Sequence, residues 1–298
     1  MASGMSKMIN LSLKKLVQIH FRPHLNISML RIDDFEKPSP MARKHCRAQN
    51  FEQDNVRGTW LYPANRHSCK VILYFHGGAY VCGPSIMQWR MLSHISWKSG
   101  YRALLINYRK APEHPFPAAL EDMEKTYDIL LENTNPENII FAGDSAGGGL
   151  ALALAMKLRD EGKPLPEKMV LFSPWLNVEM DNPETAAWEE RDNMLALPGL
   201  QEAADLYCGK ENKKSPYISP LSGDLDNLPP CYLMVGTNEL LLPDCRKLRK
   251  KAQEAGWNLK YEEWEEMFHV WMLNIPFLPE AREAINKILQ FIQDRDND

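Results

Sequence analysis

A serine stands between two glycines in the stretch Gly-Asp-Ser-Ala-Gly, residues 143–147. The stretch matches G-x-S-x-G, the pattern of a sharp strand-to-helix turn that exposes a serine hydroxyl for nucleophilic attack. Such a turn brings two backbones together, so the positions two before and two after the serine must be nearly free of side chain. Gly143 and Gly147 meet that demand. We therefore interpret Ser145 as a candidate nucleophile, held in a strained turn beside the free N–H groups of a helix start.

The same stretch allows two interpretations without a nucleophile: a glycine-rich turn with an N-cap serine, or a phosphate-binding loop. Neither G-x-x-x-x-G-K-[ST] nor G-x-G-x-x-G can be read there, which disfavours phosphate binding. Asp144, at a helix N-terminus, is interpreted as a partner of the helix dipole without a role in the chemistry. A five-residue match also arises by chance, so the nucleophile hypothesis depends on other residues.

A pair of glycines follows the apolar run at residues 70–75, in the stretch His-Gly-Gly-Ala-Tyr. Consecutive glycines can turn backbone N–H groups toward a developing negative charge, as an oxyanion hole requires. His76 is expected to hold this loop by hydrogen bonds and not to act as a base. The candidate donors of the oxyanion hole are Gly77, Gly78, Ala79 and Ala146.

A nucleophilic serine needs a base, and the base should come later in the chain, after another strand. His269 is the only one of the eight histidines that follows Ser145. A single histidine is often only a packed core residue. This one comes shortly after the last predicted strand, residues 259–264, and that position favours the base.

Two carboxylates on one loop could orient this histidine. Glu239 comes three residues after the apolar run at 231–236, where its side chain can reach the imidazole. Asp244 is farther along and is expected to cap a helix at 245–255. We favour Glu239 as the acid of the triad and keep Asp244 as the alternative.

The elements that must position these residues can be read from hydrophobic patterns. Nearly continuous apolar, β-branched runs predict strands buried on both faces, and helical periodicities lie between them. Strands that alternate with helices predict a mainly parallel sheet in a three-layer α/β fold. The predicted strands are residues 70–75, 102–108, 138–143, 168–173 and 231–236.

Two segments interrupt this alternation. Residues 1–50 begin with an amphipathic pattern, and residues 177–222 form an insertion with several prolines and a predicted helix around 200–207. Long excursions of this kind are often lids over a site. We therefore divide the chain into an N-terminal cap segment, a catalytic domain in two parts and a cap insertion: residues 1–50, 51–176, 177–222 and 223–298.

Composition excludes several classes of function. The chain has 298 residues, 25% of them charged, and a net charge of −4, which argues against nucleic acid as a partner. The N-terminus contains lysines and lacks a signal-peptide core, and no segment is apolar enough to insert in a membrane. We expect a soluble, cytoplasmic protein whose six scattered cysteines stay reduced.

No cofactor or metal is expected. His20 and His24 are four residues apart, but Pro23 breaks the helix that would align them. No H-E-x-x-H motif is present, and the cysteines form no C-x-x-C pair.

Over roughly residues 58–275 the sequence resembles the hormone-sensitive-lipase-like branch of the α/β-hydrolases, which includes many bacterial esterases. The resemblance implies an eight-stranded, mostly parallel sheet with a helical cap. Ala79 stands where the family often has a third glycine, Glu239 where aspartate is commoner, and Asn177 where aspartate is frequent. The matching stretches are HGGAY (76–80), NYRKAPEHPFPAALED (107–122), GDSAGG (143–148), SPWLN (173–177), SPYISPL (215–221), LPPCYLMVGTNELLLPD (228–244) and MFHVW (267–271).

The resemblance and the residues together predict a serine carboxylesterase that works through an acyl-enzyme. An inactive small-molecule receptor is the alternative from another class, although receptors that resemble this family lack the histidine; an amidase or carbamate hydrolase is the third. We expect small ester substrates with acyl chains of up to about eight carbons. The oligomeric state stays open, a homodimer included. The predicted lining of the acyl pocket is Met29, Leu30, Met180, Trp188, Met194, Leu195 and Leu197.

Overall fold

The computed structural model describes residues 2–16, 25–64 and 68–294. Within them, eight strands form one sheet in the order β1-β2-β4-β3-β5-β6-β7-β8. β1 and β2 are antiparallel to their neighbours, and the other strands run parallel. The mostly parallel α/β sheet predicted from the sequence is confirmed. The strands are β1 Cys46–Gln53, β2 Val56–Pro63, β3 Val71–Phe75, β4 Arg102–Ile106, β5 Ile139–Asp144, β6 Lys168–Phe172, β7 Cys231–Gly236 and β8 Leu259–Trp264.

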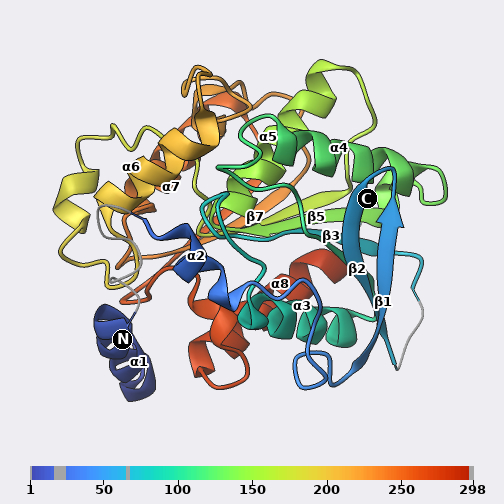
Figure 1. Cartoon of the computed structure of the whole chain (residues 1–298), viewed down its shortest axis with the longest axis horizontal. Coiled ribbons are helices and arrows are strands. Elements are labelled where there is room, and N and C mark those ends of the chain that lie inside the picture. The colour runs from blue at the N-terminus through green and yellow to red at the C-terminus, as the bar shows by residue number, and fades with distance from the viewer. Residues whose placement is uncertain (1, 17–24, 65–67, 295–298) are drawn as a thin grey trace.

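Helices cover both faces of the sheet (Figure 1). α4 (Ala118–Leu131), α5 (Ala146–Asp160) and α7 (Leu242–Ala255) pack on one face. α3 (Ile86–Ser99) and α8 (Pro279–Gln293) pack on the other. The central strand β3 is buried along its whole length, and its successive side chains enter the two hydrophobic clusters alternately. This burial on both faces explains why its sequence is continuously apolar.

All five strands predicted from apolar runs are present, with bounds that differ by at most two residues. The hairpin β1–β2 and the helix α3 were not predicted. β1 has the sequence CRAQNFEQ and is buried mainly at Cys46, because it lies at the edge of the sheet. Its polar sequence therefore carries no strand pattern. The sheet already begins at Cys46, inside the segment 1–50 that was predicted to belong to the cap, so that boundary is wrong.

Two chain segments cover the carboxyl edge of the parallel strands. The first contains α1 (Gly4–Leu16), α2 (Ile27–Leu30) and the short turn Arg31–Asp33. The second is the insertion after β6, with α6 (Leu197–Cys208) as its only α-helix among the described residues. Short 3-10 turns complete the chain at Pro136–Asn138, Thr185–Trp188, Pro220–Ser222 and Trp271–Asn274. Figure 1 shows α2 and α6 on the same side of the molecule.

An aromatic stack fastens α6 to the sheet domain. The ring of Tyr207, on α6, lies 3.6 Å from that of Tyr80 and parallel to it. The ring of Phe116 packs edge-on against the same Tyr207 ring, with 6.0 Å between the two ring centroids. Stacked and edge-to-face pairs stabilise by about 0.5–1.5 kcal/mol each beyond the area they bury, so the cap insertion is anchored at this end.

Three further sequence predictions concern partners and environment. All six cysteines lie in the described part of the chain, and each is a free thiol, as predicted. No helix among the described residues is long and apolar enough to cross a bilayer. His20 and His24, the pair weighed as metal ligands, lie outside the described residues.

Candidate active site

Ser145 occupies a strained turn between β5 and α5. Its backbone has φ 53° and ψ −123°, a region that residues with a side chain rarely adopt. The surrounding backbone fixes this conformation: the amide of Ser145 donates to the carbonyl of Phe172 (2.9 Å), and its carbonyl accepts from Trp175 (2.8 Å). The hydroxyl is thus presented at the carboxyl edge of the sheet, as the motif predicts.

The two glycines of the motif are required by space. A Cβ on Gly143 would lie 2.5 Å from the carbonyl oxygen of Gly147. A Cβ on Gly147 would lie 2.0 Å from the carbonyl oxygen of Phe75, at the end of the neighbouring strand β3. Both distances are far below van der Waals contact, so no other residue fits without moving the backbone.

Three residues distant in sequence meet beside this turn. The Nε2 atom of His269 lies 2.9 Å from the hydroxyl of Ser145, and its Nδ1 atom lies 2.7 Å from Oε2 of Glu239. A carboxylate can only accept, so Nδ1 carries the proton and Nε2 is left free to accept from the serine. This is the geometry of a serine–histidine–acid triad.

The charge around His269 favours its protonated form. Burial alone would lower its pKa, but the hydrogen bond and charge of Glu239, with the charges of Asp192 and Asp144, outweigh burial and raise it above the ordinary value. An imidazole with a raised pKa is a stronger base toward the serine hydroxyl. The site therefore stabilises the imidazolium that a proton transfer would create.

Asp244, the alternative acid, makes no contact with the histidine. It is the third residue of α7, whose N-cap is Leu241, and its side chain caps nothing; the capping prediction is wrong. Its Oδ1 instead accepts a hydrogen bond from Asn182 of the cap insertion, at 2.8 Å. Of the two carboxylates, the structure brings only Glu239 to His269.

Backbone amides without a partner lie near the serine in two elements. Gly78 and Ala79 line the cavity, and Ala146 follows Ser145 as the first residue of α5; the N–H groups of these three residues have no hydrogen-bond acceptor among the described residues. The turn that holds Gly78 and Ala79 has φ values of 123° and 52° at these residues. A Cβ on Gly78 would lie 2.1 Å from the carbonyl oxygen of Cys82, which explains the glycine there.

Gly77 departs from the prediction. Its amide donates to Oδ1 of Asp144 at 2.9 Å and is not available to an oxyanion, so its assignment as a donor is wrong. Asp144 does more than interact with the helix dipole. It also accepts hydrogen bonds from the hydroxyl of Tyr74 (2.6 Å) and from the side-chain amide of Gln88 (2.8 Å). Burial raises the pKa of Asp144, whereas these three hydrogen bonds lower it. Through its hydrogen bond with Gly77, the carboxylate connects the loop of residues 77–79 to the turn that holds Ser145.

His76 holds the loop from the other side, as predicted. Its ring stacks on Tyr108 at 4.1 Å, and its Nδ1 donates to the carbonyl of Gly77 at 2.7 Å. Burial lowers the pKa of His76 to about 3, with the charge of Lys110 acting in the same direction. The ring is therefore neutral at pH 7, and its contacts with Tyr108 and Gly77 hold the loop in place.

Two residues of the site were not singled out from the sequence. Ser173, within the SPWLN stretch, donates to Oε1 of Glu239 (2.7 Å) and accepts from the amide of Val270 (3.3 Å). It fixes the acid and the residue after the histidine together. Asp192, in the cap insertion, accepts from the amide of Leu240, the residue that follows Glu239. For Ser173 the SPW motif was a sequence signal. Asp192 lies in no motif, so the sequence contains no signal for it.

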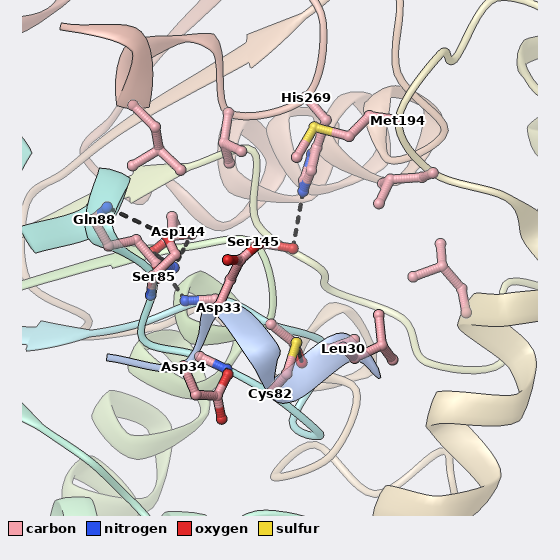
Figure 2. A pocket seen from close by; sticks show the side chains of 18 of the residues that line it. Leu30, Asp33, Asp34, Cys82, Ser85, Gln88, Asp144, Ser145, Met194 and His269 are labelled. Carbon is pink, nitrogen blue, oxygen red and sulfur yellow. Dashed lines mark hydrogen bonds between the residues drawn. The ribbon is translucent and has the colours of Figure 1, made fainter. Parts of the chain in front are cut away.

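A cavity of about 260 Å³ lies over the serine (Figure 2). Figure 2 shows His269 and Met194 on one side of Ser145 and Leu30, from the N-terminal segment, on the other. Of the seven predicted lining residues, Met180, Trp188 and Leu197 do not line it; the thioether of Met180 accepts from the indole of Trp175 instead. The residues that do are Met29, Leu30, Met194 and Leu195, joined by Leu200 and Leu273.

Metal-ligating side chains do not gather in the part of the chain that the structure describes: no group of three or more His, Cys, Asp or Glu could hold an ion there. The chemistry of the cavity is that of a hydroxyl, an imidazole, a carboxylate and backbone amides.

Comparison with known proteins places this arrangement in a family. The family model described as the alpha/beta hydrolase fold matches residues 72–273. An acetyl-hydrolase of Streptomyces hygroscopicus is 38% identical over 250 residues, 84% of this chain and 80% of that protein. An esterase of Acinetobacter venetianus is 30% identical over 245 residues, 82% and 80% of the two chains.

Solved structures agree with this placement. The bacterial esterase EstE5, in a crystal soaked with p-nitrophenyl butyrate, superposes with a TM-score of 0.89 at 33% identity over 98% of both chains. An esterase from the bacterial hormone-sensitive lipase family gives a TM-score of 0.87 at 34% identity, again over 98% of both chains.

Proposed function

We propose that this chain, which belongs to the alpha/beta hydrolase family and to its hormone-sensitive-lipase-like branch, is a serine carboxylesterase. The observation that carries the proposal is the hydrogen-bonded line from Ser145 through His269 to Glu239. The esterase names of its relatives point to the same class of bond.

In the proposed reaction, His269 removes the proton of Ser145 as its oxygen attacks the ester carbonyl. Glu239 holds the imidazole in the required tautomer and stabilises its positive charge. The amides of Gly78, Ala79 and Ala146 receive the oxyanion, each contributing about 10²–10³ in rate. His269 then protonates the leaving alcohol, and water attacks the acyl-enzyme with the histidine acting again as base.

The cavity supports short- to medium-chain acyl groups as substrates. Its volume of about 260 Å³ is slightly below the about 300–1,000 Å³ of sites for drug-sized ligands, and its lining is mainly apolar. Ala79 adds a methyl group beside the serine where the family often has glycine, which narrows the space for the acyl chain. Two predictions from the sequence remain part of the proposal: a cytoplasmic location, and a homodimer as the alternative to a monomer.

The proposal is tested with Ser145→Ala and p-nitrophenyl esters of two to twelve carbons. We expect wild-type turnover to be highest for chains of up to about eight carbons, and the variant to lose nearly all of it while its melting temperature stays unchanged. A variant that keeps a tenth of wild-type turnover would remove Ser145 from the mechanism. The receptor alternative predicts instead that wild type binds ester without turnover.

A further inference from the structure

A second cavity, of about 220 Å³, shares no lining residue with the cavity over Ser145. Three segments form it: residues 41–45 before β1, the middle of α3 from Arg90 to His94, and residues 275–277. It therefore lies on the face of the sheet that α3 and α8 cover.

Much of the lining of this second cavity is apolar. Ala42 and Ile275 are 3% and 1% exposed and belong to the hydrophobic cluster beneath. Met41 and Phe277 are 75% and 57% exposed, among the most exposed large apolar side chains of the described residues. A bound apolar group would remove this surface from water at a gain that grows with the area covered.

Two cations line the same cavity without a carboxylate beside them. Lys44 and Arg90 form no ion pair with any acidic side chain of the described residues, and no acidic residue lines the cavity. The guanidinium of Arg90 lies 5.3 Å from the ring of Phe277, and its Nη1 donates only to the thioether of Met87, at 3.6 Å. Among the described residues, the Arg90 guanidinium thus has no oxygen acceptor for its N–H groups.

Another cavity, whose lining includes Arg31, Arg109 and Lys110, shows the contrast. There Arg31 pairs with Glu113 at 2.7 Å, Arg109 with Asp122 at 2.8 Å, and Lys110 with Asp34 at 2.9 Å. Those cations are already neutralised by the protein. The cations of the second cavity leave a net positive charge next to exposed apolar surface, and such a site is complementary to an anion with an apolar tail.

We propose that the second cavity binds an amphipathic carboxylate, with its head at Arg90 and Lys44 and its tail against Ile275 and Phe277. A planar guanidinium is suited to bidentate contact with a carboxylate. The cavity is smaller than the about 300–1,000 Å³ of sites for drug-sized ligands, so a short tail of roughly six carbons fits better than a long one.

Two segments of the chain contribute lining residues to both cavities. α3 carries Gln88, which lines the catalytic cavity, and two residues later Arg90. Likewise Leu273 lines the catalytic cavity and Ile275 the second one. If the proposed function holds, the ligand belongs to the same chemical class as the acid that ester hydrolysis releases; binding itself does not depend on that function.

Calorimetric titration of the full chain with hexanoate tests the site. The enzyme is first sulfonylated with phenylmethanesulfonyl fluoride so that the catalytic cavity is filled, and the adduct is checked by intact mass. We expect one saturable site, affinity that rises about fourfold for each methylene from butanoate to hexanoate, and at least tenfold weaker binding of the neutral isostere hexanamide. Equal binding of hexanoate and hexanamide would overturn the proposal, as would the absence of binding.

Variants locate the binding. Arg90→Gln should weaken hexanoate binding at least tenfold. Arg249→Gln, which removes an exposed guanidinium 5.1 Å from the ring of Tyr261, is the matched control and should leave it unchanged. Unaltered binding in Arg90→Gln would refute the site. If Ser145 fails to react with the sulfonyl fluoride, the proposed nucleophile is in doubt, and the same comparison of Arg90→Gln with Arg249→Gln is made on Ser145→Ala.

Discussion

The carboxylate of Asp192 accepts a hydrogen bond of 2.8 Å from the amide of Leu240, the residue next to the triad acid. Its other oxygen accepts from the amides of Met194 and Leu195, at 2.7 and 2.8 Å. Those two residues line the catalytic cavity. One fully buried carboxylate from the cap insertion therefore connects the wall of the cavity to the loop that carries Glu239.

Asp192→Asn should impair both substrate binding and turnover. An amide presents an NH2 group where at least one backbone N–H now donates, so a buried donor loses its partner at a cost of about 1–3 kcal/mol. We expect a higher KM because the wall moves, and a kcat about tenfold lower because Glu239 shifts. Steady-state kinetics measure both.

Asp205→Asn is the matched control, since Asp205 lies on α6 of the same insertion but is exposed and pairs only with Lys213 among the described residues. Its KM and kcat should match wild type. A lower melting temperature in Asp192→Asn without any kinetic change would mean that Asp192 is only structural.

The pH profile of kcat/KM should report the raised pKa of His269. The protonated imidazole cannot accept the serine proton, so activity is absent at low pH and increases as His269 loses its proton. Because Glu239, Asp192 and Asp144 raise that pKa, the midpoint should lie above 6.5, the ordinary value. Glu239→Gln removes the nearest negative charge and should move the midpoint to lower pH. An unchanged midpoint in that variant would contradict the assigned pair.

The two candidate acids should separate by turnover. Glu239→Gln leaves His269 without its charged partner, and we expect kcat to fall by about 10³–10⁴. Asp244→Asn disturbs hydrogen bonds with Asn182 and Asn177 but none with His269, and should change kcat less than about tenfold. Hydrolysis of p-nitrophenyl butyrate by both variants decides the matter, and the reverse order would return the role to Asp244.

Gly147→Ala should prevent or severely weaken folding. The new methyl group would lie 2.0 Å from the carbonyl oxygen of Phe75, so β3 and α5 must move apart, at a cost of about 3 kcal/mol or more. Gly4→Ala is the control, because nothing lies within 4 Å of a Cβ there. Urea unfolding measures both; a Gly147→Ala variant as stable as Gly4→Ala would show that the tight turn is not required.

The sequence predicted those parts of the site that local patterns encode. Buried parallel strands have nearly continuous apolar sequences, so β3 and β5 could be predicted. Ser145 and His269 could be predicted because each follows a strand, where a hydroxyl or an imidazole can reach a site at the edge of the sheet. The edge strand β1 could not be recognised, because five of its eight residues are exposed and its polar sequence resembles a loop.

Contacts between distant loops could not be predicted. Nothing near Asp192 in the sequence indicates that its carboxylate meets the amide of Leu240, since that contact depends on how the cap insertion folds back. For the same reason Gly77 was assigned to the oxyanion hole. Its amide direction depends on Asp144, which follows it by 67 residues and reaches it only through the pairing of β3 with β5.

Reaction with a fluorophosphonate probe, followed by peptide mapping, tests the triad most directly. The proposed mechanism predicts a single adduct on Ser145 in the wild type and at least a hundredfold slower labelling in His269→Ala, because only the neutral imidazole activates that hydroxyl. An adduct on another residue with Ser145 unmodified, or equal labelling rates in the two proteins, would contradict it.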